Sequence, residues 1–191
     1  MRKIVIDARV IKHLGRDLIT SSEVAVIELI KNSIDAKAQN INLRVYSNNL
    51  PKELFNIAKI ANIPDDYLYK PMLLVEDDGI GMTDHTIDEG FLKIATDIKA
   101  NEKDVLGKKG IGRLATQRLG SALLVETSSS SENHTSFVFI DWNAVISGNI
   151  DVPSFESEAT SHHTRLWIFG INPEDFVDNA QAQIAFESSV E

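Results

Sequence analysis

The sequence Asp77-Asp78-Gly79-Ile80-Gly81 joins a carboxylate to two glycines. It follows the apolar run Met72–Val75, which predicts a central strand buried on both faces. Glycine has no Cβ, so the backbone can closely approach a flat ligand or adopt positive φ. A carboxylate at that strand end can accept a hydrogen bond from an exocyclic amine. Many tight turns have similar sequences. A calcium loop is a weaker alternative, because the alternating oxygen ligands and the closing bidentate acid are missing.

A second glycine-containing stretch, Gly107-Lys108-Lys109-Gly110-Ile111-Gly112-Arg113, precedes a predicted helix that ends near Leu119. Successive backbone N–H groups at a helix N-terminus can bind an anion. The stretch is neither a Walker A loop nor a dinucleotide fingerprint, since Lys-Ser/Thr does not follow the last glycine and no strand leads directly into it. Between Lys93 and Arg118, seven basic and three acidic residues give +4, although the whole chain carries −9. This basic segment favours a small polyanion such as a nucleoside triphosphate; a solvated loop with incidental lysines is the alternative.

Another helix is predicted to begin near Thr20 and to end near residues 37–40, before the glycine motifs, and it carries a row of polar side chains. Glu28, Asn32 and Asp35 have the spacing i, i+4, i+7, which places them on one helix face. Thr20 with Glu23 fits a capping box at its start. The same row is also typical of a solvated helix face. The predicted buried stripe of this helix consists of Ile27, Ile30 and Ile34.

Taken in order, three motifs resemble the N, G1 and G2 boxes of the GHKL ATPases. They are Glu28-x-x-x-Asn32-x-x-Asp35-Ala36, Asp77-x-Gly79-x-Gly81-Met82 and Gly107-x-x-Gly110-x-Gly112. The superfamily includes DNA gyrase B, the ninety-kilodalton heat-shock chaperone, histidine kinases and MutL. His163-Thr164-Arg165-Leu166 resembles its fourth element, with His163 in place of the usual glycine. The resemblance covers about residues 20–170. It implies an α+β Bergerat-type fold: a two-layer sandwich of a mixed, largely antiparallel sheet with helices on one face and an ATP lid.

The resemblance also implies a role for each matching position. Glu28 would orient and deprotonate the attacking water, Asn32 would ligate Mg²⁺, and Asp77 would bind the adenine amine with help from Thr164. Phosphoryl transfer to water needs such a metal clamp, a water-orienting carboxylate and an anion cradle. The other expected nucleotide-binding residues are Asp35, Gly79, Gly81, Met82, Lys99, Gly107, Lys108, Lys109, Gly110, Ile111 and Gly112. Lys99 could reach the γ-phosphate or be a solvated lid lysine.

The activity implied is Mg²⁺-dependent ATP binding with slow hydrolysis to ADP and phosphate, coupled to lid closure and to dimerisation or partner clamping. A glutamate four residues before the Mg²⁺ asparagine is the hydrolase pattern of gyrase, MutL and the chaperone, whereas histidine kinases typically lack it. The wording of the first motif is most similar to the MutL, MORC-type and chaperone branch. One alternative is a nucleotide-gated interaction module that does not hydrolyse ATP. A histidine-kinase-like phosphotransferase is a more distant one.

Length and composition set the remaining expectations. The 191 residues are predicted to form one domain, 1–191, with residues 47–70 as an insertion and 95–112 as the ATP lid. We expect a following transducer domain, absent from this sequence, to supply a lysine that contacts the γ-phosphate. We also expect the full-length protein to form a homodimer on nucleotide-dependent closure. The lack of cysteine excludes disulfides and thiolate metal sites. The absence of a signal peptide or membrane-length apolar run predicts a cytoplasmic protein. The charge of −9 predicts nucleic-acid binding only through other domains.

Strands are predicted at residues 3–6, 41–46, 72–75, 122–127, 136–142 and 164–169, and a helix at 175–191.

Overall fold

The computed structural model describes most of the sequence outside the glycine-rich segment and the C-terminal end. The described residues are 2–3, 5–6, 19, 21–47, 50–94, 114–146, 151–159 and 161–177. The predicted ATP lid, residues 95–112, lies outside them, as does most of the predicted helix 175–191.

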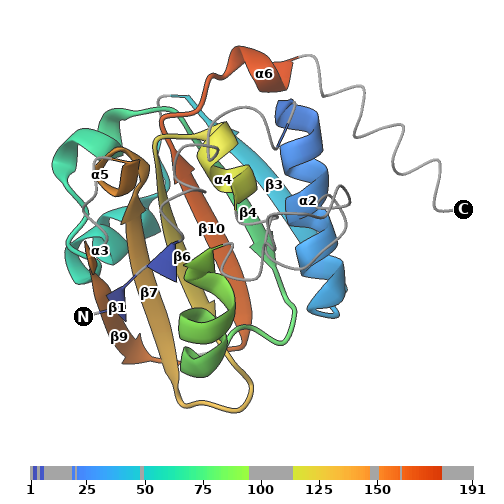
Figure 1. Ribbon diagram of the computed structural model, residues 1–191, viewed down its shortest axis with the longest axis vertical. Coiled ribbons are helices and arrows are strands. Elements are labelled where there is room, and N and C mark those ends of the chain that lie inside the picture. The colour runs from blue at the N-terminus through green and yellow to red at the C-terminus, as the bar shows by residue number, and fades with distance from the viewer. Residues whose placement is uncertain are drawn as a thin grey trace, which may run out of the picture.

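A six-stranded antiparallel sheet forms the centre of the fold (Figure 1). In spatial order its strands are β3 (Ile41–Tyr46), β4 (Met72–Asp77), β10 (His163–Phe169), β6 (Ala122–Ser128), β7 (His134–Asp141) and β9 (Ser154–Glu158). Two short pairs accompany it: β1 (Arg2–Lys3) with β8 (Asp151–Val152), and β2 (Val5–Ile6) parallel to β5 (Lys93–Ile94). The predicted strands are confirmed, although Trp142 begins a helix, α5 (Trp142–Ile146), instead of ending a strand.

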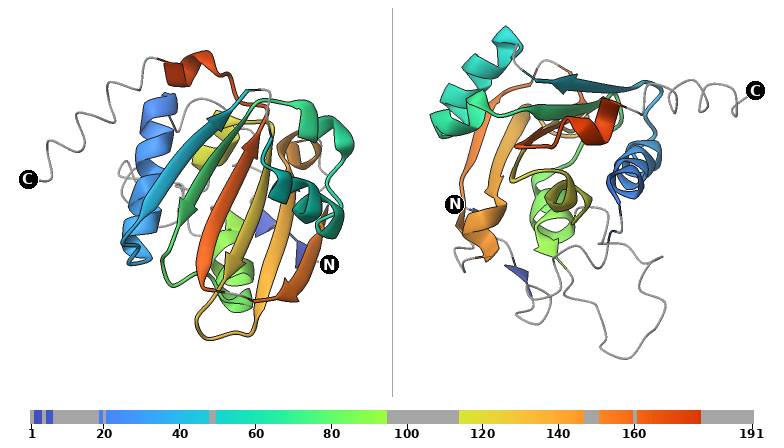
Figure 2. Two further views of the ribbon diagram at one scale, coloured as in Figure 1. Left: turned by 180° about the vertical axis from the view of Figure 1, so that it is seen from behind. Right: turned by 90° about the horizontal axis from the view of Figure 1, so that it is seen from above.

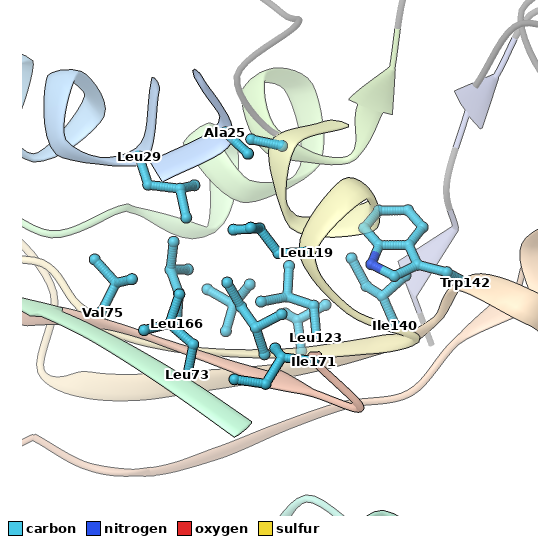
Figure 3. Packing of buried hydrophobic residues seen from close by; sticks show 14 of the residues in the cluster. Ala25, Leu29, Leu73, Val75, Leu119, Leu123, Ile140, Trp142, Leu166 and Ile171 are labelled. Atoms are coloured by element: carbon cyan, nitrogen blue, oxygen red, sulfur yellow. The ribbon is translucent and has the colours of Figure 1, made fainter. Parts of the chain in front are cut away.

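One face of the sheet packs against α2 (Ser22–Asp35), the π-helical turn η2 (Thr86–Phe91) and α4 (Leu114–Leu119) (Figure 2). Figure 3 shows Ala25 and Leu29 of α2 above the aliphatic side chains of the sheet. Trp142 closes one end of this cluster and is 2% exposed. Burial of this apolar surface is the main driving force that holds the helices on the sheet.

The opposite face of the sheet is covered as well. The helix α3 (Lys52–Ile60) and the 3₁₀ helix η1 (Asp65–Tyr69) pack there against a second apolar cluster (Figure 2). Leu54, Ile57 and Ala58 have helical spacing, and all three are buried. The antiparallel sheet with its helices agrees with the predicted α+β fold, but the expectation of helices on one face only is incomplete. Residues 50–69 supply a third layer.

The helix α2 is rotated relative to its predicted orientation. Ile27 and Ile34, predicted to be buried, are 50% and 56% exposed, and the buried positions are Ser22, Ala25, Leu29 and Ser33. Small side chains let α2 approach the sheet and α4 closely, and we attribute the rotation to this approach. The N-cap is Ser21, whose Oγ accepts a hydrogen bond from the Val24 amide at 3.3 Å. Thr20, the residue of the predicted capping box, lies outside the described residues.

The C-terminal described element is the short helix α6 (Glu174–Val177). It is tied to the start of α2 by a hydrogen bond from Ser22 Oγ to Asp175 Oδ2 at 2.7 Å. None of the described helices is long and apolar enough to cross a membrane.

Candidate functional site

Asp77 is a buried carboxylate at the end of β4. Its residue is 6% exposed, and its two oxygens have different donors. Ser33 Oγ donates to Oδ2 at 2.8 Å, and the Gly79 amide donates to Oδ1 at 3.0 Å. Burial raises the pKa of Asp77 above its ordinary value, and the two hydrogen bonds oppose this effect. The carboxylate is therefore held in one orientation at the strand end.

Ser33 is a site residue that sequence reasoning missed. It is 3% exposed and lies four residues after Leu29 on the buried face of α2. Its hydroxyl connects the helix directly to the strand end, because it donates to Asp77. A polar residue one position after Asn32 would have been the available signal, but only if the buried face of the helix had been assigned correctly.

Gly79 and Gly81 allow close backbone packing around Asp77. A Cβ on Gly79 would lie 2.8 Å from the carbonyl oxygen of Ala36 and 2.9 Å from Asp77 Oδ1. Gly81 has φ of +68°, and a Cβ there would lie 2.0 Å from the carbonyl oxygen of Ser128. Both positions therefore require glycine, in agreement with the predicted close approach of the backbone.

Two threonines follow Asp77 across the sheet, on the next strand and on the one after it. Thr164 in β10 is the register partner of Asp77 in β4 and of Thr127 in β6. The Thr127 and Thr164 hydroxyls are 3.1 Å apart, and the Met82 amide donates to Thr127 Oγ1 at 2.9 Å. Thr127 is fully buried and was not predicted; its signal is the strand register, which the sequence does not reveal.

The departure from the fourth motif has a structural explanation. The ring of His163 contacts Glu126 Oε1 at 3.3 Å, and Glu126 also accepts from the indole of Trp167. Trp167 belongs to the cluster under α3, on the opposite face of the sheet from Ser33 and Asp77. Because neighbouring strand residues point to opposite faces, His163 does not displace Thr164 from Asp77.

The polar row of α2, which consists of Glu28, Asn32 and Asp35, ends beside the glycine turn that follows Asp77. The Ile80 amide donates to the carbonyl of Ala36 at 2.9 Å, which joins the glycine turn to the helix end. Asn32 and Glu28 precede Ala36 by four and eight residues, or about 6 and 12 Å along the helix axis at ~1.5 Å per residue. Glu28 pairs with Lys31 at 2.7 Å, and Asn32 and Asp35 are exposed.

Asp78, the residue after Asp77, stabilises the segment that connects α2 to β3. It accepts hydrogen bonds from the amides of Gln39 and Asn40, both at 2.8 Å, and from the Asn40 side chain at 2.7 Å. The hydrogen bonds from Asn40 hold the pKa of Asp78 below its ordinary value. Asp78 therefore fixes the connection between α2 and β3, and with it the end of the polar row.

The structure thus brings Asp77, Gly79, Gly81, Met82 and Thr164 together at one end of the sheet, beside the helix that carries Glu28, Asn32 and Asp35. The remaining predicted site residues lie outside the described part of the chain: Lys99, Gly107, Lys108, Lys109, Gly110, Ile111 and Gly112.

A buried carboxylate, a glycine turn and two threonine hydroxyls can recognise a flat ligand with an amine, and exposed amide and carboxylate groups extend away from them. No curated protein matches the chain. Residues 19–166 match the family model described as histidine kinase-, DNA gyrase B- and HSP90-like ATPase. This span includes every residue of the site. The chain therefore belongs to the family of histidine kinase-, DNA gyrase B- and HSP90-like ATPases.

Proposed function

We propose that this chain binds ATP with Mg²⁺ and hydrolyses it slowly to ADP and phosphate. The observation that carries the proposal is the burial of Asp77 at the strand end, with Ser33 and Gly79 as its donors. Burying a carboxylate is unfavourable unless it is compensated, so a carboxylate retained here points to a ligand that it recognises. An exocyclic amine is the matching group, and membership of an ATPase family supports adenine as its source.

In this proposal the nucleotide runs from Asp77 along α2. The adenine lies against Gly79, Gly81 and Met82, and the phosphates follow the helix towards Asn32. The side-chain amide oxygen of Asn32 suits Mg²⁺, which prefers oxygen ligands and retains several waters. Bound Mg²⁺ would neutralise phosphate charge.

Glu28 is proposed as the general base. A water attacks the γ-phosphorus and gives its proton to the Glu28 carboxylate, the bond to the β,γ-bridging oxygen breaks, and ADP leaves. The ion pair of Glu28 with Lys31 joins two partly exposed groups at i, i+3, and such pairs are weak. Glu28 can therefore leave Lys31 when a water and a nucleotide are present.

The binding half of the proposal is tested by calorimetric titration with a non-hydrolysable ATP analogue, with and without Mg²⁺. We expect Mg²⁺-enhanced binding that Asp77→Asn abolishes, because the amide presents a donor to the amine. Asp65→Asn is the matched control, since Asp65 is an exposed aspartate in η1 on the other side of the sheet. Equal affinity of Asp77→Asn and the unchanged protein would refute the assignment of Asp77.

The hydrolysis half is tested with Glu28→Gln, which keeps the shape of the side chain but removes the base. We expect analogue affinity to stay within about twofold while phosphate release falls at least about 100-fold, the contribution typical of a general base. Glu53→Gln in α3 is the control. Normal turnover by Glu28→Gln would exclude Glu28 as the base. Binding without turnover in the unchanged protein would favour a nucleotide-gated interaction module.

Three finer expectations remain predictions from the sequence. They are the lid role of residues 95–112, a homodimer formed on nucleotide-dependent closure, and similarity to the MutL, MORC-type and chaperone branch. The mass measured by light scattering with and without the analogue tests the homodimer.

A further inference from the structure

A cluster of potential metal ligands lies at a different place, where η2 meets the strands β7 and β9. Asp84, His134 and Glu156 each offer one ligand atom, and these three atoms lie within 4.8 Å of one another. Asp84 precedes η2, His134 begins β7, and Glu156 is in β9 (Figure 1). We propose that these residues bind one divalent transition-metal ion of the Zn²⁺ type, without nucleotide.

The Nε2 atom of His134 lies close to two carboxylates but forms a hydrogen bond with neither, as expected for atoms that share a metal ion. Its Nε2 lies 3.2 Å from Asp84 Oδ2 and 3.7 Å from Glu132 Oε2. Nevertheless, this buried nitrogen has no partner with hydrogen-bond geometry among the described residues. Two ligand atoms that each lie about 2.0–2.1 Å from a tetrahedral Zn²⁺ are roughly 3.3–3.4 Å apart, and their lone pairs point to the ion between them. The distance from His134 to Asp84 fits this arrangement.

The carboxylate of Asp84 is oriented by its surroundings. Ser136 Oγ donates to Oδ1 at 2.9 Å, while Oδ2 is the oxygen that faces His134. The backbone amide of Asp84 donates hydrogen bonds to both carboxylate oxygens of Glu132, at 3.3 Å and 3.2 Å, and these bonds fix the backbone of Asp84. Hydrogen bonds that orient ligating carboxylates in this way are usual around metal sites.

The charge and donor set of the cluster favour a metal cation. The carboxylates of Asp84, Glu132 and Glu156 surround a single imidazole, so even a protonated His134 leaves two negative charges. One imidazole and two carboxylates are nitrogen and oxygen donors that suit Zn²⁺, and the fourth position would hold water. Glu156 is exposed, so a small side-chain rotation can bring its oxygen to the ion.

Occupation of this site would join three elements. The ion would tie the start of η2 to two strands of the sheet, just beyond the turn that contains Gly81 and Met82. The cluster is separate from Asn32, and its metal binding does not depend on ATP.

The test is titration of the chelator-treated protein with Zn²⁺ alone, followed by calorimetry and by thermal unfolding. We expect one Zn²⁺ per chain and a midpoint that rises with Zn²⁺ concentration, because a ligand that binds the native state stabilises it. His134→Gln and Glu156→Gln should each lower the affinity at least about tenfold. Glu156 is exposed, so its variant is expected to fold normally.

Two control variants separate this site from others. His162→Gln changes an exposed histidine outside the cluster, and Asn32→Ala removes the proposed Mg²⁺ ligand; neither should change Zn²⁺ binding. The proposal is overturned if the protein shows no saturable 1:1 binding, or if His134→Gln and Glu156→Gln bind Zn²⁺ as the unchanged protein does. Either result would leave His134 as the simple ion-pair partner of Asp84.

Discussion

At the scale of single residues, Asp77 and Asp78 show how adjacent carboxylates acquire opposite properties. Asp77 is buried, and burial raises its pKa, whereas Asp78 is exposed and its hydrogen bonds from Asn40 lower its pKa. A raised pKa means that ionisation of Asp77 opposes folding at neutral pH. Its contribution to stability is fully present below the ordinary aspartate pKa of 3.8 and is lost as the pH rises through the higher pKa of the folded state. In the proposed function, the carboxylate of Asp77 recognises the ligand at a cost in folding stability.

We therefore predict that Asp77→Asn raises the thermal midpoint by a few degrees at pH 7 while it abolishes ATP binding. The amide removes the buried charge but can still accept from Gly79. The gain should grow as the pH rises from below 3.8 towards 7, which thermal melts at several pH values measure.

Asp78→Asn is the comparison and should show the opposite sign. Its lowered pKa means that the carboxylate stabilises the protein above 3.8, and that this contribution is lost as the pH falls through the folded value. A lower midpoint for Asp77→Asn than for the unchanged protein at pH 7 would contradict the conclusion that the buried charge of Asp77 opposes folding.

At the scale of elements, a ladder of charged side chains crosses four strands on the α3 face of the sheet. Arg165 of β10 donates to Glu76 of β4 at 2.6 Å and to Glu126 of β6 at 3.2 Å, and Arg44 of β3 lies 3.8 Å from Glu76. Burial alone would raise the pKa of Glu126, but hydrogen bonds from His163 and Trp167 and the charge of Arg165 hold it below its ordinary value. The ladder therefore fixes the strand register beside Thr164.

We predict that Glu126→Ala lowers the free energy of unfolding by about 3 kcal/mol at pH 7, because it leaves Arg165 and the indole of Trp167 without this acceptor. The loss should shrink as the pH falls below the ordinary glutamate pKa of 4.5 and through the lower pKa of the folded state, where the carboxylate of the unchanged protein is protonated. Urea unfolding at several pH values measures it.

Glu158→Ala, an exposed glutamate in β9, is the control for that experiment and should change stability by no more than about 0.5 kcal/mol. An equal effect of the two substitutions would mean that the ladder does not stabilise the sheet.

The sequence predicted the strands correctly but not the buried face of the helix α2. The alternating run 41–46 and the apolar run 72–75 predicted strands because periodicity and length depend only on local sequence. The buried face of α2 was predicted wrongly. The prediction placed the apolar side chains of Ile27 and Ile34 inside, whereas the structure buries Ser33, which donates a hydrogen bond to Asp77. This contact joins residues 44 positions apart, so local sequence does not reveal it. Thr127 was missed for the same reason, since its site role follows from strand register.

At the scale of the whole molecule, residues 50–69 change the fold from two layers to three. Tyr67 packs edge-on against Phe139 and Phe169, with ring centroids 5.5 and 6.1 Å apart, and Lys70 lies 3.9 Å from the centre of the Tyr67 ring. Burial raises the pKa of Tyr67 to about 12. Residues 50–69 belong to the segment 47–70 that the sequence predicts as an insertion, and they form part of the core on the far side of the sheet from Asp77.

This placement predicts that the layer supports the site through stability and not through contact with the ligand. Leu54→Ala removes a fully buried side chain from α3, so we expect a loss of about 2–5 kcal/mol in urea unfolding. ATP-analogue affinity should stay within about twofold under conditions where the variant remains folded, since the sheet lies between Leu54 and Asp77. Phe55→Ala, the next residue, is 49% exposed and should change stability by no more than about 0.5 kcal/mol. Loss of partner binding by Phe55→Ala without loss of stability would indicate a partner role for the outer face of α3. Weaker nucleotide binding by folded Leu54→Ala would show that the two faces of the sheet are coupled.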